Sequence, residues 1–183
     1  MEILETAIPE VKIVVPKVFG DARGYFFESW NAGKYTEAGI DCKWMQDNES
    51  RSRFGVLRGL HYQAAPYTQA KLVRVIEGAV LDVAVDIRKG SPTFGKHVAV
   101  ELTAENKYQL FVPRGFAHGF LVLTDTAEFC YKCDDFYHAD DEGGLAWNDP
   151  EIGIRWPELA DGTTLKLSEK DRSWRGLRDT FAY

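Results

Sequence analysis

Residues 55–63, with the sequence GVLRGLHYQ, bring together a guanidinium, an imidazole, a phenol and an amide in a segment that otherwise reads as a strand. Side chains two positions apart in a strand point to the same face, so strict alternation places Arg58 and His61 on opposite faces. Gly59, or a local bulge, relaxes that alternation and leaves their relative orientation open. A histidine on a rigid strand with cations nearby predicts proton transfer on an anionic ligand. A buried histidine hydrogen-bonded to the backbone is the alternative.

The segment PRGFAHGF at residues 113–120 has the PxGxxH pattern of the second cupin motif, in which a turn delivers a histidine, here His118, to a jelly-roll strand. In metal-binding cupins the first motif adds HxH, closely followed by Glu. The corresponding residues are His61, Tyr62 and Gln63, followed by two alanines and a proline. Because two imidazoles leave Zn or Fe under-coordinated, we expect no metal, and a metal-dependent cupin oxygenase is disfavoured.

Composition narrows the class of protein further. The chain has 183 residues, 13% aromatic residues and 16 glycines, which favours one domain, residues 1–183, built from strands and turns. A net charge of -6 without any lysine/arginine block argues against nucleic acid or an anionic membrane as partner. The apolar runs are too short to cross a bilayer, and three cysteines without a signal peptide predict reduced thiols and a cytoplasmic location.

Turn residues recur about every 8–12 positions, and the segments between them are short and rich in Val, Phe, Tyr and Ile. This spacing predicts a sandwich or barrel rather than a parallel α/β sheet. One helix is expected at 31–38, with Asn31 as its cap and Gly39 as its stop. From about Pro157 the chain looks irregular, with a turn of helix at 168–170. The predicted strands are 11–16, 24–30, 56–62, 70–77, 79–86, 95–102, 108–112, 119–123 and 128–133.

Six segments together resemble the dTDP-4-dehydrorhamnose 3,5-epimerase family, metal-free cupins of nucleotide-sugar biosynthesis. The resemblance implies an all-β fold, a cupin-type double-sheet jelly roll with a few short peripheral helices. It also implies an enzyme without cofactors that forms a homodimer, in which the region of Arg23 reaches the active site of the partner. The matching segments, in the order of the family, are 19–28, 46–52, 55–63, 71–75, 113–120 and 167–171.

The reaction of this family inverts dTDP-4-dehydro-6-deoxy-D-glucose at C3 and C5 to give dTDP-4-dehydro-L-rhamnose, in dTDP-L-rhamnose biosynthesis. Both carbons are α to the C4 ketone, so a base can remove each proton to give an enolate that is reprotonated from the opposite face. By the resemblance, His61 is the base and Asp171 orients and charges it. Tyr131 is then the acid, and Lys71 is the cation near the C4 oxygen.

Each of these residues also has an ordinary structural interpretation. Asp171 lies in a charged segment, where an exposed carboxylate is the commoner case. Tyr131 fits ordinary aromatic core packing. Lys71 shares a predicted strand face with Val73, so it is either a lysine that buries its stem and keeps its ammonium in water or a functional group.

The resemblance further assigns substrate-binding residues according to their chemistry. Guanidinium and imidazole groups bind the phosphates and sugar hydroxyls, other polar side chains bind the base and sugar, and aromatic rings stack on thymine. In that order the residues are Arg23, Arg58 and His118; Glu28, Gln46 and Asn48; and Phe19, Phe26 and Tyr137. Because Arg23 lies in a turn, an exposed charge and a ligand-facing loop both remain open.

Two rival functions remain at this point. One is a monofunctional 3- or 5-epimerase of a related nucleotide 4-keto sugar. Retention of Tyr131 favours the double reaction, because an acid on the far face completes each inversion. The other is a non-catalytic sugar-binding jelly roll, in which replacing His61 would change affinity alone. The segment 147–150 and the tail from Trp174 receive no chemical role.

Overall fold

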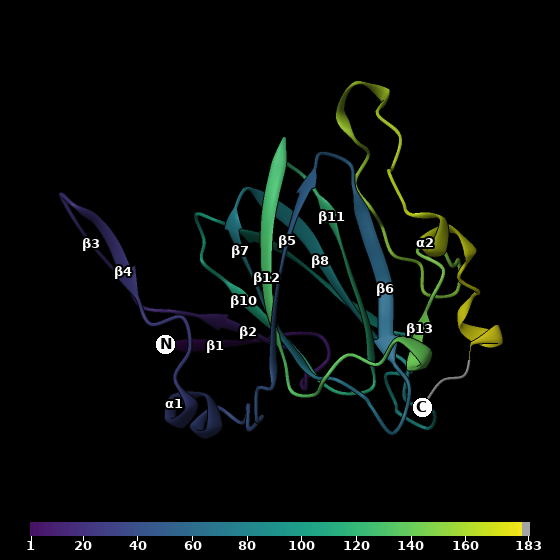
Figure 1. The fold of residues 1–183 in the computed structure, drawn as a ribbon, viewed down its shortest axis with the longest axis horizontal. Coiled ribbons are helices and arrows are strands. Elements are labelled where there is room, and N and C mark those ends of the chain that lie inside the picture. Colours follow the sequence, from purple (N-terminus) through teal and green to yellow (C-terminus); the bar gives the residue numbers. More distant parts are fainter. Residues whose placement is uncertain (181–183) are drawn as a thin grey trace.

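Two antiparallel β-sheets face each other in the structure, a computed structural model that describes residues 1–180 (Figure 1). The six-stranded sheet has the order β1-β2-β10-β7-β12-β5, and the five-stranded sheet has the order β13-β6-β11-β8-β9. A separate hairpin, β3-β4, extends away from both (Figure 1). The strands are β1 (Glu2–Glu5), β2 (Lys12–Val15), β3 (Val18–Asp21), β4 (Gly24–Phe27), β5 (Gln46–Arg53), β6 (Leu57–Gln63), β7 (Lys71–Glu77), β8 (Ala79–Asp86), β9 (His97–Thr103), β10 (Gln109–Val112), β11 (Phe116–Val122), β12 (Thr126–Cys133) and β13 (Glu142–Gly144).

The helices are short and lie outside the sheets, as expected. The helix predicted at 31–38 is confirmed as α1 (Ala32–Glu37), and the Asn31 side chain caps it by accepting the N–H of Lys34 at 3.1 Å. In the part of the chain that the structure describes, neither α-helix has the length or the apolar character to cross a membrane. The remaining helical segments are α2 (Glu169–Ser173) and the 3-10 turns η1 (Ala139–Asp141), η2 (Ala160–Gly162) and η3 (Leu177–Asp179).

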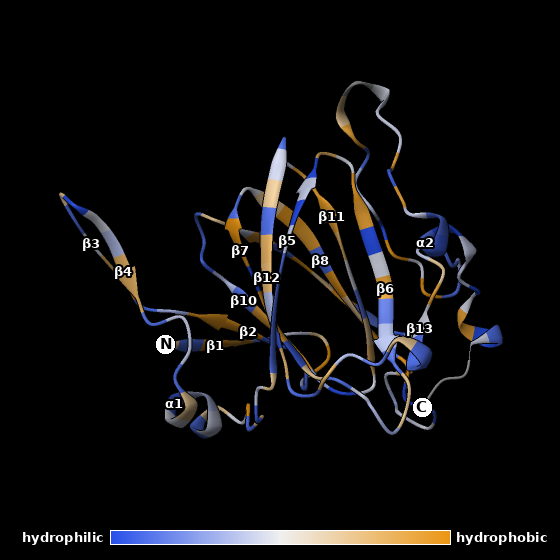
Figure 2. Ribbon diagram, in the orientation of Figure 1, coloured by the Kyte–Doolittle hydropathy of each residue, from blue (hydrophilic) through white to orange (hydrophobic). Residues whose placement is uncertain are grey.

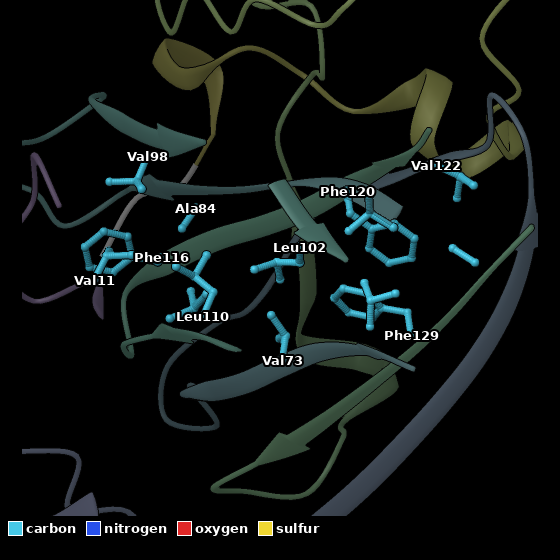
Figure 3. Close-up of a cluster of buried hydrophobic side chains, with 14 of the residues drawn as sticks. Val11, Val73, Ala84, Val98, Leu102, Leu110, Phe116, Phe120, Val122 and Phe129 are labelled. Atoms are coloured by element: carbon cyan, nitrogen blue, oxygen red, sulfur yellow. The ribbon is translucent and has the colours of Figure 1, made fainter. Parts of the chain in front are cut away.

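The main core lies between the two sheets, where side chains from both meet (Figure 3). Phe120 from β11 stacks on Phe129 from β12 with ring centroids 4.2 Å apart, and Leu102 and Leu110 are fully buried in the same cluster. Full burial of one such side chain stabilises the fold by about 1.5–3 kcal/mol. This core fixes the distance between the sheets and therefore the width of any site formed between them.

Most predicted strands are present, with boundaries that differ in places. The strand predicted at 119–123 begins earlier, at Phe116, because the turn at 113–115 ends directly before it. The strand predicted at 24–30 ends at Phe27. The strand β5 was not predicted because its sequence, QDNESRSR, is polar throughout, and Figure 2 shows it in hydrophilic colours. Pairing of β5 along the whole of β12 nevertheless makes it an edge strand of the six-stranded sheet.

A buried carboxylate anchors the turn that follows β8. Asp86 has no exposed side-chain surface, and its oxygens accept hydrogen bonds from Arg88, Ser91 and Thr93 at 2.6–2.9 Å. Burial by itself would raise the pKa of Asp86, but these hydrogen bonds lower it to about 2. A group with a depressed pKa in the folded state stabilises the fold above its unfolded pKa and loses that contribution as the pH falls towards its folded pKa.

We expect Asp86→Asn to lower the free energy of unfolding by about 2 kcal/mol at pH 7 and by about 1 kcal/mol at pH 3, because the wild-type carboxylate becomes protonated in the unfolded chain below about pH 4. Urea unfolding of both proteins at the two pH values measures this difference. Asp125→Asn, at an exposed carboxylate, is the matched control. A difference between wild type and Asp86→Asn that is the same at both pH values would contradict this prediction.

Candidate active site

A histidine and an aspartate from distant parts of the chain form a close pair. His61, on β6, places Nε2 2.5 Å from Oδ1 of Asp171, on α2. The Asp171 side chain is only 5% exposed, whereas His61 remains 30% exposed and so is accessible to a ligand. A turn of helix is expected at 168–170, and the helix α2 is present at Glu169–Ser173; the hydroxyl of Ser168 accepts the backbone N–H of Asp171 at 3.0 Å and caps it. This cap fixes the helix that presents the carboxylate.

The electrostatics of this pair favour an ionised Asp171. Burial raises the pKa of the carboxyl, but the hydrogen bond and charge of His61 and the donors of Ser168 and Trp174 lower it below its usual value overall. An ionised carboxylate on the imidazole fixes its tautomer and stabilises the imidazolium that forms when the ring accepts a proton. The pair can therefore act as a general base.

A bulge in β6 brings Arg58 to the same side as His61. In the pairing with β11, His61 faces His118 and Arg58 faces Phe120, so β6 has one more residue than β11 between these two pairs. Gly59, with φ +126°, permits this geometry, since a Cβ there would lie 2.6 Å from the Cα of Gly119. Arg58 donates from Nε to the Ser52 hydroxyl at 3.0 Å, and it lines a pocket together with His61 and Asp171. The open question of their orientation is thus settled by the extra residue.

A tyrosine and a lysine face this histidine from the opposite sheet. Tyr131 on β12 and Lys71 on β7 belong to the six-stranded sheet, and both line one pocket with His61 of the five-stranded sheet. The Nζ of Lys71 lies 6.0 Å from the centroid of the Tyr131 ring. A planar ligand held in this pocket would therefore meet an imidazole on one side and a phenol on the other.

Burial shifts the pKa values of both Tyr131 and Lys71. It raises the pKa of Tyr131, and Cys133 adds to this, so the phenol carries its proton at neutral pH and can donate it. Burial lowers the pKa of Lys71 overall, although electrostatic interactions with Cys133, Asp82 and Glu142 act to raise it. Hydrogen-bond donors in a largely dry pocket stabilise a developing oxyanion more strongly than they would in water.

His118 is the neighbour of His61 on the adjacent strand and is more deeply buried. It is paired with His61 across β11 and β6, and its Nε2 lies 2.7 Å from Oδ1 of Asp82, which is fully buried. Its ring stacks on Phe129 in the core. Within residues 1–180 there is no cluster of three or more His, Cys, Asp and Glu side chains arranged as metal ligands.

Three of the predicted substrate-binding residues lie together in the pocket. Gln46 and Asn48, from β5, form a hydrogen bond of 2.9 Å with each other, and the backbone N–H of Tyr137 donates to Gln46 Oε1 at 3.1 Å. The Tyr137 hydroxyl donates to Oε2 of Glu142. An exposed aromatic ring beside amide groups suits the binding of a nucleotide base.

Four other predicted residues lie away from this pocket. Phe19, Arg23 and Phe26 are on the β3-β4 hairpin, which projects from the body of the protein (Figure 1). Arg23 pairs with Asp21 at 2.6 Å in the turn of this hairpin. Glu28, just beyond it, accepts from Lys34 at 2.7 Å. The structure of one chain therefore does not bring these four residues to His61.

Three residues at the site were missed from the sequence. Glu142 accepts hydrogen bonds from the phenol of Tyr137 and from the ammonium of Lys170. Burial raises the pKa of Glu142, but these donors lower it overall. Trp174, directly after α2, presents its ring to His61 at 6.3 Å between centroids. Lys170 adjoins Asp171 in a matched segment and could have been found, whereas Glu142 and Trp174 stand in segments without any pattern.

These observations define a class of protein, a double-sheet jelly roll whose inter-sheet pocket is equipped for acid–base chemistry. The sequence model of a family described as dTDP-4-dehydrorhamnose 3,5-epimerase matches residues 5–179. The chain belongs to this family and is an enzyme of the isomerase class.

Individual relatives support the same assignment. A dTDP-4-dehydrorhamnose 3,5-epimerase of Shigella flexneri is 58% identical over 158 residues, which are 86% of this chain and 87% of the relative. The crystal structure of a dTDP-6-deoxy-D-glucose-3,5-epimerase from Legionella pneumophila, in complex with dTDP-4-keto-L-rhamnose, is 52% identical with a TM-score of 0.92, covering 97% of this chain and 93% of that one. A 3'-monoepimerase from Streptomyces bikiniensis, a histidine–tyrosine double mutant in complex with dTDP, is 34% identical with a TM-score of 0.87 over 94% and 86% of the two chains.

Proposed function

We propose that this enzyme epimerises dTDP-4-dehydro-6-deoxy-D-glucose at C3 and C5 by proton transfer alone, with His61 as base and Tyr131 as acid, and that it serves dTDP-L-rhamnose biosynthesis. The observation that carries the proposal is the approach of these two side chains to one pocket from opposite sheets. Inversion needs a base on one face of the sugar and an acid on the other. The ligand of the Legionella pneumophila relative, dTDP-4-keto-L-rhamnose, has the chemistry of the proposed product.

Each inversion is balanced in protons and electrons. His61 takes the proton from the carbon next to the C4 ketone, and the electron pair moves onto the C4 oxygen as an enolate. Lys71 stabilises that oxygen, while Asp171 stabilises the imidazolium on the other side. Tyr131 returns a proton to the opposite face of the carbon. Exchange with water then removes the proton from His61 and restores that of Tyr131 before the second carbon reacts.

One relative supports the alternative that the enzyme inverts a single carbon. The Streptomyces bikiniensis 3'-monoepimerase had a histidine and a tyrosine 70 positions apart replaced, the separation of His61 and Tyr131 here. The presence of Tyr131 therefore does not by itself distinguish double from single epimerisation. Proton NMR of the isolated product does, because the ring-proton couplings report the configuration at both carbons. A product inverted at one carbon only would contradict the proposed double reaction.

We also propose that the enzyme is a homodimer and that the β3-β4 hairpin packs on the partner subunit. Three aromatic rings of this hairpin are more than half exposed, Phe19 at 53%, Tyr25 at 61% and Phe26 at 70%. An isolated two-stranded hairpin is at best marginally stable in water, and a group of exposed aromatic rings marks an interaction surface. Packing of this hairpin on a second copy of the chain would also bring Arg23 to the substrate pocket of that copy.

We expect the double variant Phe19→Ser/Phe26→Ser to weaken dimerisation by about 10²-fold or more, since each ring stabilises an interface by about 1.5–3 kcal/mol when buried. Light scattering across a dilution series measures the dissociation constant. Phe94→Ser, at a ring 38% exposed on another loop, is the matched control. A wild-type chain that is monomeric at all concentrations would overturn the dimer proposal.

We propose a cytoplasmic location because the cysteines are not paired in disulfides. Cys42, Cys130 and Cys133 are all free thiols. Thiols persist in reducing compartments, whereas secreted proteins usually pair them.

A further inference from the structure

Trp174 is the residue on which the elements carrying the proposed base converge. It directly follows α2, the helix of Asp171. Its ring meets the His61 ring edge-on, at an interplanar angle of 71° and 6.3 Å between centroids. The Nζ of Lys170 lies 6.0 Å from the centroid on the same ring. The indole is therefore in contact with α2 and with β6 at the place where they hold the His61–Asp171 pair.

The third element in contact with Trp174 is β13. A Cβ added at Gly144 would lie 2.4–2.5 Å from three atoms of the indole, so the ring packs directly against the main chain there. Gly144 is paired with His61 between β13 and β6. The indole is thus enclosed between the strand next to His61 and the helix that bears Asp171.

The indole N–H of Trp174 is buried near the proposed base pair. Its Nε1 is buried and makes no hydrogen bond of ordinary geometry within residues 1–180. The same indole is one of the groups that lower the pKa of Asp171, so it favours the charged carboxylate.

We propose that Trp174 is a positioning residue, whose ring sets the distance between α2 and β13 and thereby holds the Asp171 carboxylate in line with His61. This inference rests on the proposed role of His61 as base. Trp174 would influence the reaction through Asp171 and His61 rather than by acting on the substrate itself. A misplacement of about 1 Å at such a pair lowers the rate by about 10²-fold.

Kinetics of three variants test the positioning role. We expect Trp174→Ala to lower kcat by about 10²-fold with little change in KM, because the pair is misaligned while the substrate contacts are kept. Gly144→Ala, which retains the indole but displaces it, should act in the same direction. Trp174→Phe should recover most of kcat. Trp156→Phe, which removes an indole N–H bonded to the Trp147 carbonyl, is the matched control.

A spectroscopic measurement distinguishes positioning from mere packing. An imidazole N–H bonded to a carboxylate gives a proton NMR signal well downfield of the amides, and such pairs among the described residues include His61–Asp171 and His118–Asp82. We expect folded Trp174→Ala to lose or shift the His61 signal and to keep the His118 signal, which serves as an internal reference. Unchanged signals with unchanged kcat would overturn the positioning role. Full activity of His61→Asn would instead overturn the proposed base.

Discussion

We expect His61→Asn to lower kcat by about 10²–10⁴-fold, the usual contribution of a general base, while the affinity for the nucleotide changes little. Asparagine is similar in size to histidine and can still hydrogen-bond Asp171, but it cannot accept a proton at neutral pH. The rate loss therefore measures the proton transfer rather than a collapse of the site. Turnover of dTDP-4-dehydro-6-deoxy-D-glucose, followed by proton NMR, and calorimetric binding of dTDP give the two quantities.

The control for this prediction is His97→Asn. His97 begins β9 at the far edge of the five-stranded sheet and lines none of the pockets around His61. Its replacement should leave kcat within about threefold of wild type, as for most substitutions away from a site. Equal activity of the His61 and His97 variants would rule out His61 as the base.

The second large effect is expected for Tyr131→Phe, which should lower the rate of inversion by about 10²–10⁴-fold and yet preserve proton exchange in the substrate. The His61–Asp171 pair is intact in this variant, so the enolate still forms. Without the phenol, His61 returns the proton to the face from which it came. Substrate recovered from D2O should therefore carry deuterium in its original configuration, as proton NMR can show.

Tyr108→Phe provides the comparison. Tyr108 packs against the main core and does not line the pocket that contains Tyr131, so the loss of its hydroxyl should not affect inversion. If Tyr131→Phe forms the inverted product at the wild-type rate, another group is the acid. If it abolishes exchange as well as inversion, Tyr131 takes part in proton removal instead.

Much of the fold could be predicted because turn residues and short apolar segments determine it locally. The capped helix α1 and most of the strands follow from such patterns. The polar strand β5 could not, because its place in the sheet depends on pairing with β12, which is distant in the sequence. The resemblance to a family, rather than any local pattern, pointed to Asp171 as the partner of His61.

The site shows the same division between local and long-range causes. Strict alternation separates Arg58 from His61, and the extra residue that reunites them is visible only in the pairing of β6 with β11. Trp174 carries no local signal, because its ring packs against the main chain at Gly144 and meets His61, both of which are distant in the sequence. Residues on the β3-β4 hairpin would need a second subunit to reach the pocket.

The proposed double epimerisation is tested most directly by proton NMR of dTDP-4-dehydro-6-deoxy-D-glucose incubated with the wild-type enzyme in D2O. We expect deuterium to enter at both C3 and C5, with inversion at both, and we expect His61→Asn to abolish exchange at both. Deuterium at a single carbon would contradict the double epimerisation. Exchange at neither carbon, with dTDP still bound, would contradict the proposed chemistry for this substrate.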